Sequence, residues 1–138
     1  KHTAIVLPSD VVVGKPENRE NGGAVKKVDE ISPGSNILDI GPETQAHFGS
    51  IIAKAKTIIW NGPMGYIENP LFKRGTDFIY YSITHNRGAI SIVGGGDTIV
   101  AISKEEYLEK ITHISTGGGA MLEYIQNGTL PGIEALKS

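Results

Sequence analysis

Two runs of three glycines mark the places in this sequence where binding chemistry is most expected. Gly94–Gly96 and Gly117–Gly119 each follow a short apolar segment and precede a segment whose apolar residues have helical spacing. Glycine has no Cβ to hinder the approach of an anion, and clustered amide N–H groups at a helix start favour a phosphate. A single triplet would more simply be a tight turn from strand to helix. Two triplets on successive strand–helix units favour phosphate binding.

Asp97 follows the first triplet directly and would place a carboxylate beside the bound phosphate. The two groups would repel each other unless a divalent cation lay between them. Mg²⁺ suits this position, because it is commonly held by one or two carboxylates together with substrate phosphates and water. Thr98 could add a hydroxyl donor. The alternative interpretation is that Asp97 is only a helix N-cap or an acid of the first helical turn, which is a common role.

The segment NGPMGYIEN (61–69) is the third candidate loop, and it follows the apolar run TIIW. Asn61 could donate its amide to a phosphate, and Pro63 could supply a flat apolar wall. Glu68 could accept hydrogen bonds from ribose hydroxyls. Each of these residues also has an ordinary explanation as a turn or surface residue. Trp60, at the end of the strand, is more simply a core residue than a ligand-stacking one.

Other familiar sites have no support in this sequence. GGGDTI lacks the last glycine of G-x-G-x-x-G, and no G-x-x-x-x-G-K precedes Ser or Thr, which disfavours dinucleotide and Walker-type sites. No G-x-S-x-G occurs, so acyl transfer is unsupported. The chain has no Cys, which excludes disulfides, thiolate metal sites and thiol catalysis. The histidines show no close metal-type pairing, and His113 is interpreted as a hydrogen-bonded strand residue; they are His2, His47, His85 and His113.

Strand-like and helix-like segments alternate around these loops. The expected strands are 3–8, 36–40, 57–62, 89–93 and 111–116, with a hairpin formed by 10–14 and 24–32. The expected helices are 41–56, 69–85, 97–110 and 120–128. We divide the chain into a strand and hairpin (1–35), repeated strand–helix units (36–128) and a C-terminal tail (129–138), together a single partial domain.

Four successive strand–helix units predict an α/β fold. The strands are apolar rather than alternating, which is typical of a parallel sheet buried between helices. The predicted architecture is therefore a three-layer Rossmann-like parallel sheet with helices on both faces, plus a small β-hairpin. Open sheets of this kind bind ligands at the carboxyl ends of their strands. The three candidate loops all follow strands, so they should meet at that edge.

Composition limits the classes of partner. The 138 residues suffice for one compact domain, and 13 Lys and Arg against 15 Asp and Glu give a net charge of −2. This near-balance argues against an electrostatic grip on nucleic acid or on an anionic membrane. The apolar runs are far shorter than a membrane span, and no signal peptide is recognisable. A strand that begins at the first residues suggests that its sheet neighbours are encoded upstream, so we expect a fragment.

Several strings of this sequence together resemble the C-terminal, nucleotide-binding half of phosphoglycerate kinase. They are LPSDVVV, DIGPET, WNGPMG, GGGDT, HISTGGGA and LPGIEAL, and their order and spacing match the family from about Thr3 to Leu136. The sequence departs from the family at Tyr66 and Ile67, where Val and Phe are expected, and in the loop from Gly14 to Gly23. These departures concern the shape of the adenine pocket rather than phosphate binding.

The resemblance implies a role for each matching residue. Glu68 is similar to the ribose-binding carboxylate, and Asn61 and Pro63 are similar to the phosphate and adenine-side contacts. Leu7 resembles a residue of the adenine pocket, and His113 matches a position near the interdomain hinge. The implied nucleotide loop comprises Gly94, Gly95, Gly96, Asp97 and Thr98, with Asp97 the partner of Mg²⁺. The implied catalytic glycines are Gly95, Gly118 and Gly119, and Gly117 to Gly119 resemble the helix start that faces the phosphoryl group in transfer.

The family's activity implies a phosphoryl transfer between 1,3-bisphosphoglycerate and ADP, which yields 3-phosphoglycerate and ATP in glycolysis. In the family, 3-phosphoglycerate is held by an arginine-rich patch on an N-terminal domain, and a lysine of an early segment helps to clamp the phosphates. Neither the arginine-rich patch nor this lysine has a counterpart in this chain. Its arginines, Arg19, Arg74 and Arg87, do not lie in the corresponding motifs.

We therefore expect the chain alone to be inactive and to bind MgADP or MgATP weakly. The resemblance further implies a cytoplasmic, monomeric full-length enzyme. A stand-alone nucleotide-binding or regulatory module without chemistry is the alternative. The tail from Leu130 to Leu136 resembles one that packs on the other domain, so here it should be mobile or covered by a neighbouring chain.

Overall fold

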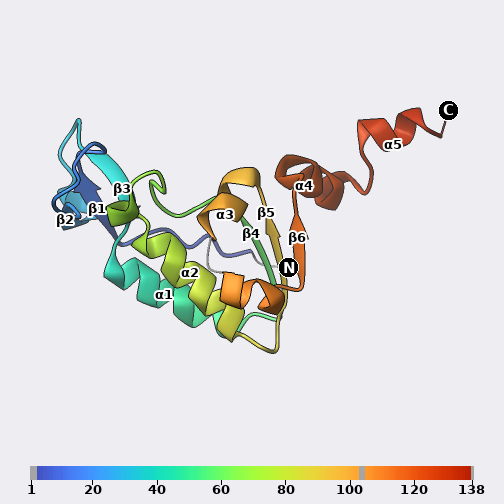
Figure 1. Cartoon of the computed structure of the whole chain (residues 1–138), viewed down its shortest axis with the longest axis horizontal. Helices are drawn as coiled ribbons and strands as arrows, with labels where there is room; N and C mark the ends of the chain where they lie inside the picture. The colour runs from blue at the N-terminus through green and yellow to red at the C-terminus, as the bar shows by residue number, and fades with distance from the viewer. Residues whose placement is uncertain (1–2, 103–104, 138) are drawn as a thin grey trace.

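The computed structural model of the chain describes residues 3–102 and 105–137. Its elements, with η denoting 3₁₀ helices, are β1 (Asp10–Gly14), β2 (Ala24–Lys27), η1 (Val28–Glu30), β3 (Asn36–Ile40), α1 (Pro42–Ile52), β4 (Thr57–Asn61), η2 (Pro70–Phe72), α2 (Arg74–His85), β5 (Ile90–Gly94), α3 (Gly96–Ala101), η3 (Glu105–Lys110), β6 (His113–Ser115), α4 (Gly118–Asn127) and α5 (Pro131–Ala135). Figure 1 shows an antiparallel sheet at one end, a parallel sheet in the middle and α5 projecting at the other end.

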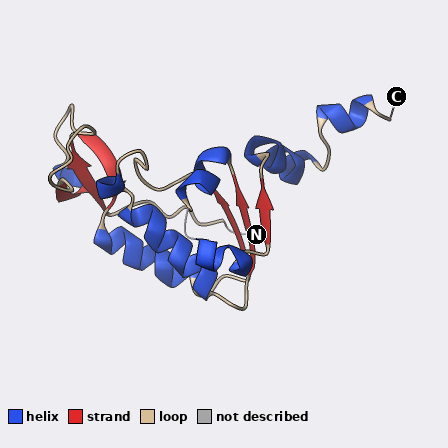
Figure 2. Cartoon of the chain, in the orientation of Figure 1, coloured by secondary structure: helices blue, strands red, loops and turns tan. Residues whose placement is uncertain are grey.

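The parallel sheet has three strands in the order β4-β5-β6, and helices flank it (Figure 2). Thr57 pairs with Ile90 and Asn61 pairs with Gly94, so β4 and β5 end at the same level. Gly94 in turn pairs with Ser115 at the end of β6. The α/β class, with a parallel sheet and a small antiparallel sheet, is therefore confirmed. The parallel pairing brings the carboxyl ends of the three strands to one edge.

The strand at 36–40 does not belong to that sheet, so the expectation of four parallel strands is wrong. β3 instead pairs antiparallel with β1, which also pairs with β2, in the order β2-β1-β3. The predicted hairpin of β1 and β2 is confirmed. An apolar run such as NILDI predicts a strand, but it carries no signal for the direction of its partner.

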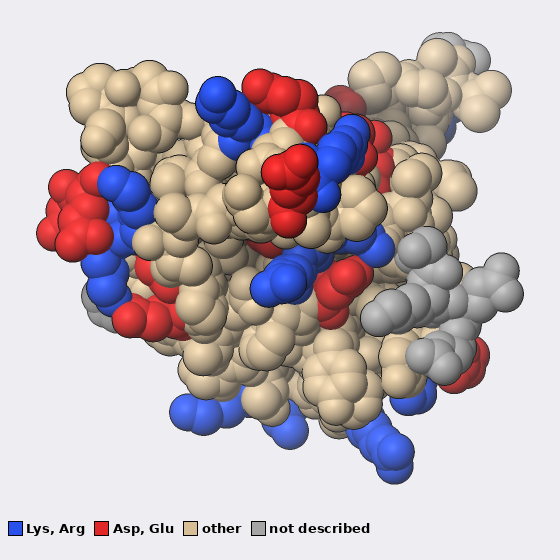
Figure 3. Space-filling model, turned by 60° about the vertical axis from the view of Figure 1, so that its left-hand side comes forward, with Lys and Arg blue, Asp and Glu red and all other residues tan. Residues whose placement is uncertain are grey.

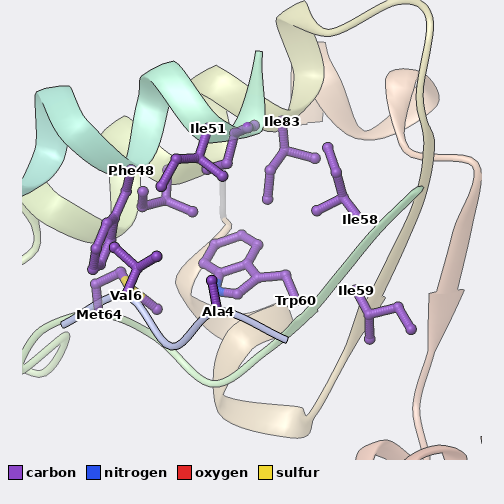
Figure 4. A pocket seen from close by; sticks show the side chains of 11 residues that line it. Ala4, Val6, Phe48, Ile51, Ile58, Ile59, Trp60, Met64 and Ile83 are labelled. Atoms are coloured by element: carbon purple, nitrogen blue, oxygen red, sulfur yellow. The ribbon is translucent and has the colours of Figure 1, made fainter. Parts of the chain in front are cut away.

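Helices α1 and α2 pack on one face of the parallel sheet. The buried cluster between them and the sheet includes Trp60, Ile79, Ile83 and Val93. Trp60 is 5% exposed, which confirms its interpretation as a core residue. In Figure 4 its ring faces a pocket between the helices and the segment that carries Ala4 and Val6. The volume of this pocket is about 350 Å³. Trp60 Nε1 has no hydrogen-bond partner within the described part of the chain.

The segment from Thr3 to Pro8 forms no strand, contrary to expectation. Its β-forming residues favour a strand, but such residues alone do not provide the backbone pairing that a strand requires. No described strand pairs with this segment, and Ile5 is 85% exposed, although Ala4 and Val6 line a pocket together with Ile58 and Ile59 of β4. A second correction concerns the helix expected over 97–110: α3 ends at Ala101, and 105–110 is the 3₁₀ helix η3.

The remaining expectations concern the tail and the surface. The tail forms α5, which buries no residue, and Leu136 is 88% exposed. His2, Ser103 and Lys104 lie outside the described residues. Figure 3 shows basic and acidic side chains interspersed on the face that it presents. Among the described helices, none has both the length and the apolar character that crossing a membrane requires.

The antiparallel sheet supplies the N-terminal caps of α1 and α2. The N-cap residues of these helices, Gly41 and Lys73, make no capping side-chain hydrogen bond. The carboxylate of Asp10 in β1 instead accepts from Thr44 N, at 2.8 Å, and from Glu43 N, at 3.1 Å. Asp39 in β3 accepts from Gly75 N in the first turn of α2 at 2.8 Å. Two strand carboxylates thus satisfy helix amides that would otherwise lack partners.

Candidate functional site

The three candidate loops meet at the carboxyl edge of the parallel sheet, as predicted. A Cβ on Gly118 would overlap the backbone N of Gly95 and would lie 2.6 Å from Asn61 Oδ1. The start of α4 therefore packs directly against the first glycine triplet and the end of β4. Gly94 makes a similar approach, because its Cβ would lie 3.3 Å from Gly118 Cα. At Gly118, glycine is required by the close approach of two backbones, whereas a Cβ on Gly94 would chiefly displace the end of the Met121 side chain.

The first triplet turns sharply between β5 and α3. Gly95 has a φ of +92°, which favours glycine, and its Cβ would lie 2.8 Å from Asn61 Oδ1. Thr98 is fully buried, and its hydroxyl accepts from Gly62 N at 2.7 Å. The side chain of Thr98 thus holds the loop after β4 against the loop after β5. This contact gives Thr98 a structural role besides the proposed nucleotide contact.

The open sides of both triplets face away from the rest of the chain. Gly96 and Gly119 are exposed, and a Cβ on either would meet nothing within 4 Å. The first hydrogen bond of α3 starts at Ile99 N and that of α4 at Met121 N, so the preceding amides lack helical partners. Donors from two helix starts are therefore available beside the contact between Gly95 and Gly118. None of the three loops contains Lys or Arg.

Asp97 lies in the first turn of α3 and is exposed. Gly95 occupies the N-cap position, so the N-cap alternative for Asp97 is wrong, while its place as a first-turn acid is confirmed. Within the described ranges, no group of three or more His, Cys, Asp or Glu side chains could hold a metal ion. A cation at Asp97 would thus take most of its ligands from phosphate and water, an arrangement that suits Mg²⁺.

The residues assigned to the sugar and the base lie outside the two glycine triplets. Glu68 is exposed and Pro63 is half-buried, on the loop between β4 and η2. Leu7 is 73% exposed and lines a cavity of about 490 Å³ together with Met64. The structure thus places Leu7 near the Pro63 end of this loop.

Sequence reasoning missed the residues that hold this loop in place. Thr76 is fully buried in the first turn of α2, and its hydroxyl accepts from Met64 N at 3.0 Å and from Gly65 N at 3.3 Å. Asp39, 3% exposed, lies beneath them. One signal could have drawn attention to Asp39: it is a charged residue inside the apolar run NILDI.

Burial raises the pKa of Asp39 to about 6, against the opposing hydrogen bonds from the N–H groups of Gly75 and Ile40. The nearby carboxylate of Asp77 also raises this pKa, and Arg74 lowers it. The folded state therefore holds the proton of Asp39 to a higher pH than the unfolded chain does, so this group stabilises the fold at low pH. The contribution falls as the pH rises through about 6.

We predict that Asp39→Asn, which carries no titrating group, reduces the pH dependence of stability. The free energy of unfolding is compared between the parent chain and the variant at each pH. The excess of the parent over the variant should be about 1 kcal/mol larger at pH 5 than at pH 7. Urea unfolding of both chains at both pH values measures this change. The other titrating groups are the same in the two chains, so their contributions cancel. A difference that does not change between the two pH values would show that Asp39 titrates alike in the folded and unfolded chain.

Comparisons with known proteins agree with this geometry. A family model described as phosphoglycerate kinase matches residues 1–128. A phosphoglycerate kinase of Herpetosiphon aurantiacus is 46% identical over 132 residues, which make up 96% of this chain and 33% of that protein. The chain thus spans about a third of the length of that relative.

Two solved structures are similar to this chain. The phosphoglycerate kinase of Coxiella burnetii gives a TM-score of 0.81 at 37% identity, covering 96% of this chain and 34% of that protein. The phosphoglycerate kinase of Pyrococcus horikoshii gives 0.76 at 35% identity, covering 94% of this chain and 32% of that protein.

Proposed function

This chain belongs to the phosphoglycerate kinase family, and on that premise we propose that its three loops bind the phosphates of ADP or ATP with Mg²⁺. The observation that carries the proposal is the contact of Gly118 with Gly95 and Asn61, which joins two helix starts into one set of amide donors. With no Lys or Arg in these loops, backbone amides must supply much of the attraction for phosphate.

Each loop has its own part in this proposal. Gly94, Gly95 and Gly96 surround the phosphates, and Asn61 donates its amide to them. The amides of Gly117, Gly118 and Gly119 face the phosphoryl group in transfer, where Gly95, Gly118 and Gly119 stabilise charge on its oxygens. Such catalysis rests on positioning and charge stabilisation rather than on covalent chemistry by a side chain.

The sugar and base occupy the other end of the site in this proposal. Glu68 accepts from the ribose hydroxyls, and Pro63 and Leu7 provide apolar walls for adenine. The cavity shared by Leu7 and Met64 supports an apolar surface at this end. Tyr66 and Ile67 lie on the same loop, so we expect them to alter the outline of the adenine pocket.

Asp97 fits Mg²⁺ because its carboxylate is exposed beside the first triplet. Mg²⁺ supplies positive charge that neutralises the phosphates when it is bound. Asp97 would hold the ion from the first turn of α3, and Thr98 fixes the loop on which that turn begins.

We further propose that the whole enzyme transfers a phosphoryl group between 1,3-bisphosphoglycerate and ADP in glycolysis, as a monomer in the cytoplasm. The family assignment supports this activity. We propose that 3-phosphoglycerate is bound by a domain outside this chain. The chain alone would then bind nucleotide weakly and transfer no phosphoryl group.

The proposal predicts a metal-dependent effect of Asp97→Ala. This variant should weaken MgADP binding at least about tenfold, because a charged ligand of the ion is lost, but should change metal-free ADP binding little. Titration calorimetry with and without Mg²⁺ measures both, and Asp29→Ala, which removes an exposed acid far along the chain, is the matched control.

Equal losses for ADP and MgADP would contradict the magnesium role and leave Asp97 as a first-turn acid only. A coupled assay with ATP and 3-phosphoglycerate completes the test. Turnover by the chain alone, at the rate of an intact kinase, would contradict the proposal that the acceptor site lies elsewhere.

A further inference from the structure

The loop Gly62–Asn69 carries Pro63 and Glu68, and several of its backbone N–H groups donate hydrogen bonds to neighbouring elements. At its start, Gly62 N donates to Thr98 Oγ1. In its middle, Met64 N and Gly65 N donate to Thr76 Oγ1, and Tyr66 N donates to Leu38 O at 2.8 Å. The loop thus contacts the first turn of α2 and the middle of β3.

The far end of the loop is fixed by Asn69, whose side chain is fully buried. Its Nδ2 donates to Asn18 O at 2.6 Å and to Pro16 O at 3.0 Å, and its Oδ1 accepts from Leu71 N. Glu68 precedes this anchor directly and follows the anchored middle of the loop. The position of its exposed carboxylate therefore depends on contacts that Glu68 itself does not make.

Asp39 fills the space beneath the middle of the loop. Its Oδ2 accepts from Gly75 N at 2.8 Å, and its Oδ1 accepts from Ile40 N at 2.9 Å. A Cβ on Gly65 would lie 2.5 Å from Asp39 Oδ1, and one on Gly75 would overlap the same oxygen. The carboxylate is therefore packed between the backbone of the loop and the backbone of α2.

From these contacts we infer that Asp39 is a positioning residue, which sets the start of α2 and the adjoining loop and so places Glu68 for the ribose. The inference deepens the proposed function and rests on its assignment of Glu68. Asp39 would not touch the nucleotide. It would act through Gly65 directly, and through Thr76, the next residue along α2 from Gly75.

The residue type follows from the contacts. An apolar side chain of similar size would leave Gly75 N–H and Ile40 N–H buried without an acceptor, which is costly. Alanine would also leave space into which the loop could sink. Displacements of about 1 Å at a binding group can cost about a hundredfold in rate, so even a small shift of the loop would be felt at Glu68.

The test separates ribose recognition from phosphate binding. The probes are MgADP, the Mg²⁺ complex of 2′-deoxyADP and Mg²⁺ pyrophosphate, titrated calorimetrically into the parent chain and into Asp39→Ala, Asp39→Asn and Glu68→Ala. The matched control is Asp77→Ala, an acid in the same turn of α2 that pairs with Lys73 at 3.0 Å.

We expect the parent chain to bind ADP about tenfold more tightly than 2′-deoxyADP, as a hydrogen bond to a charged acceptor would give. Asp39→Ala should lower this ratio to about that of Glu68→Ala, while pyrophosphate affinity stays within about twofold of the parent. Asp39→Asn, which retains one acceptor oxygen, should give an intermediate ratio. Asp77→Ala should leave the ratio unchanged.

Two results would overturn the inference. An equal loss for all three probes would show a general effect on folding, and an unchanged ratio in both Asp39 variants would show that the loop keeps its place without this carboxylate. Should Asp39→Ala fail to fold, the Asp39→Asn ratio decides.

A second measurement needs no nucleotide. Amide hydrogen exchange at Met64, Gly65 and Tyr66 should become at least about tenfold faster in Asp39→Ala, with the amides of β5 unaffected. If exchange is faster in Asp39→Ala but the parent chain binds none of the probes, the proposed function is contradicted. The dependence of the loop on Asp39 is then still supported. Unchanged exchange would overturn the inference itself.

Discussion

Replacing Gly118 with alanine should abolish measurable binding of MgADP. The added Cβ would overlap Gly95 N and lie 2.6 Å from Asn61 Oδ1, so it meets backbone on one side and the end of β4 on the other. Backbone cannot rotate aside as a flexible side chain can, and α4 must therefore move away from the first triplet. Because both sets of amide donors must face the same phosphates, we expect a loss of at least about a hundredfold in affinity.

Calorimetry on Gly118→Ala checks this expectation, with thermal unfolding measured in parallel. The matched control is Gly132→Ala in α5, also a helical glycine, whose Cβ would meet nothing within 4 Å. The variant should lose about 1–3 kcal/mol of stability, as overpacked sites do, and the control should lose little. Normal MgADP affinity in a folded Gly118→Ala chain would contradict the convergence of the two helix starts on one ligand.

Asp10→Ala should produce the largest loss of stability. The Asp10 carboxylate is 2% exposed, and it accepts from Thr44 N, Glu43 N and the hydroxyl of Thr44. Removing it leaves the first amides of α1 without their acceptor. We expect the free energy of unfolding to fall by about 3 kcal/mol, measured by urea unfolding near neutral pH.

The effect of Asp10→Ala should depend on pH in a defined direction. Burial raises the pKa of Asp10, but the hydrogen bonds from Thr44 and Glu43 outweigh it and hold the pKa below its ordinary value. The ionised group thus stabilises the fold above about pH 4, and this contribution is lost as the pH falls through the lowered pKa. The difference in the free energy of unfolding between the parent chain and Asp10→Ala should therefore become smaller as the pH is lowered. Asp29→Ala serves as the control. A difference in the free energy of unfolding that grows in acid would contradict a lowered pKa of Asp10.

The sequence allowed the centre of the site to be predicted because its signals are local. A glycine triplet after an apolar run, or an asparagine at the end of a strand, can be recognised without knowing the rest of the fold. Parallel strands then bring such loops to one edge, which is why the sequence predicts Asn61, Gly95 and Gly118 as residues of one site. The roles of individual atoms toward a nucleotide stay predictions.

The predictions that were wrong concern elements whose pairing depends on residues far away in the sequence. The run NILDI satisfies the pattern of a buried strand in either sheet, so its antiparallel pairing with β1 had no local signal. The segment from Thr3 to Pro8 has strand-forming residues, but no described strand pairs with it. The role of Asp39 lies in its contact with Gly75, 36 positions along the chain. Only the presence of a charge in an apolar run pointed toward it.

The two strand carboxylates also have a consequence for how the chain reaches its final form. Asp10 and Thr44 are 34 positions apart in the sequence, and Asp39 and Gly75 are 36 positions apart. The first amides of α1 and α2 therefore gain their acceptors only after a long loop of chain has closed. Helices that begin this way gain little stability alone and should form together with the small sheet in one cooperative step. Such dependence on distant pairing is typical of chains that fold more slowly than helical bundles of the same size.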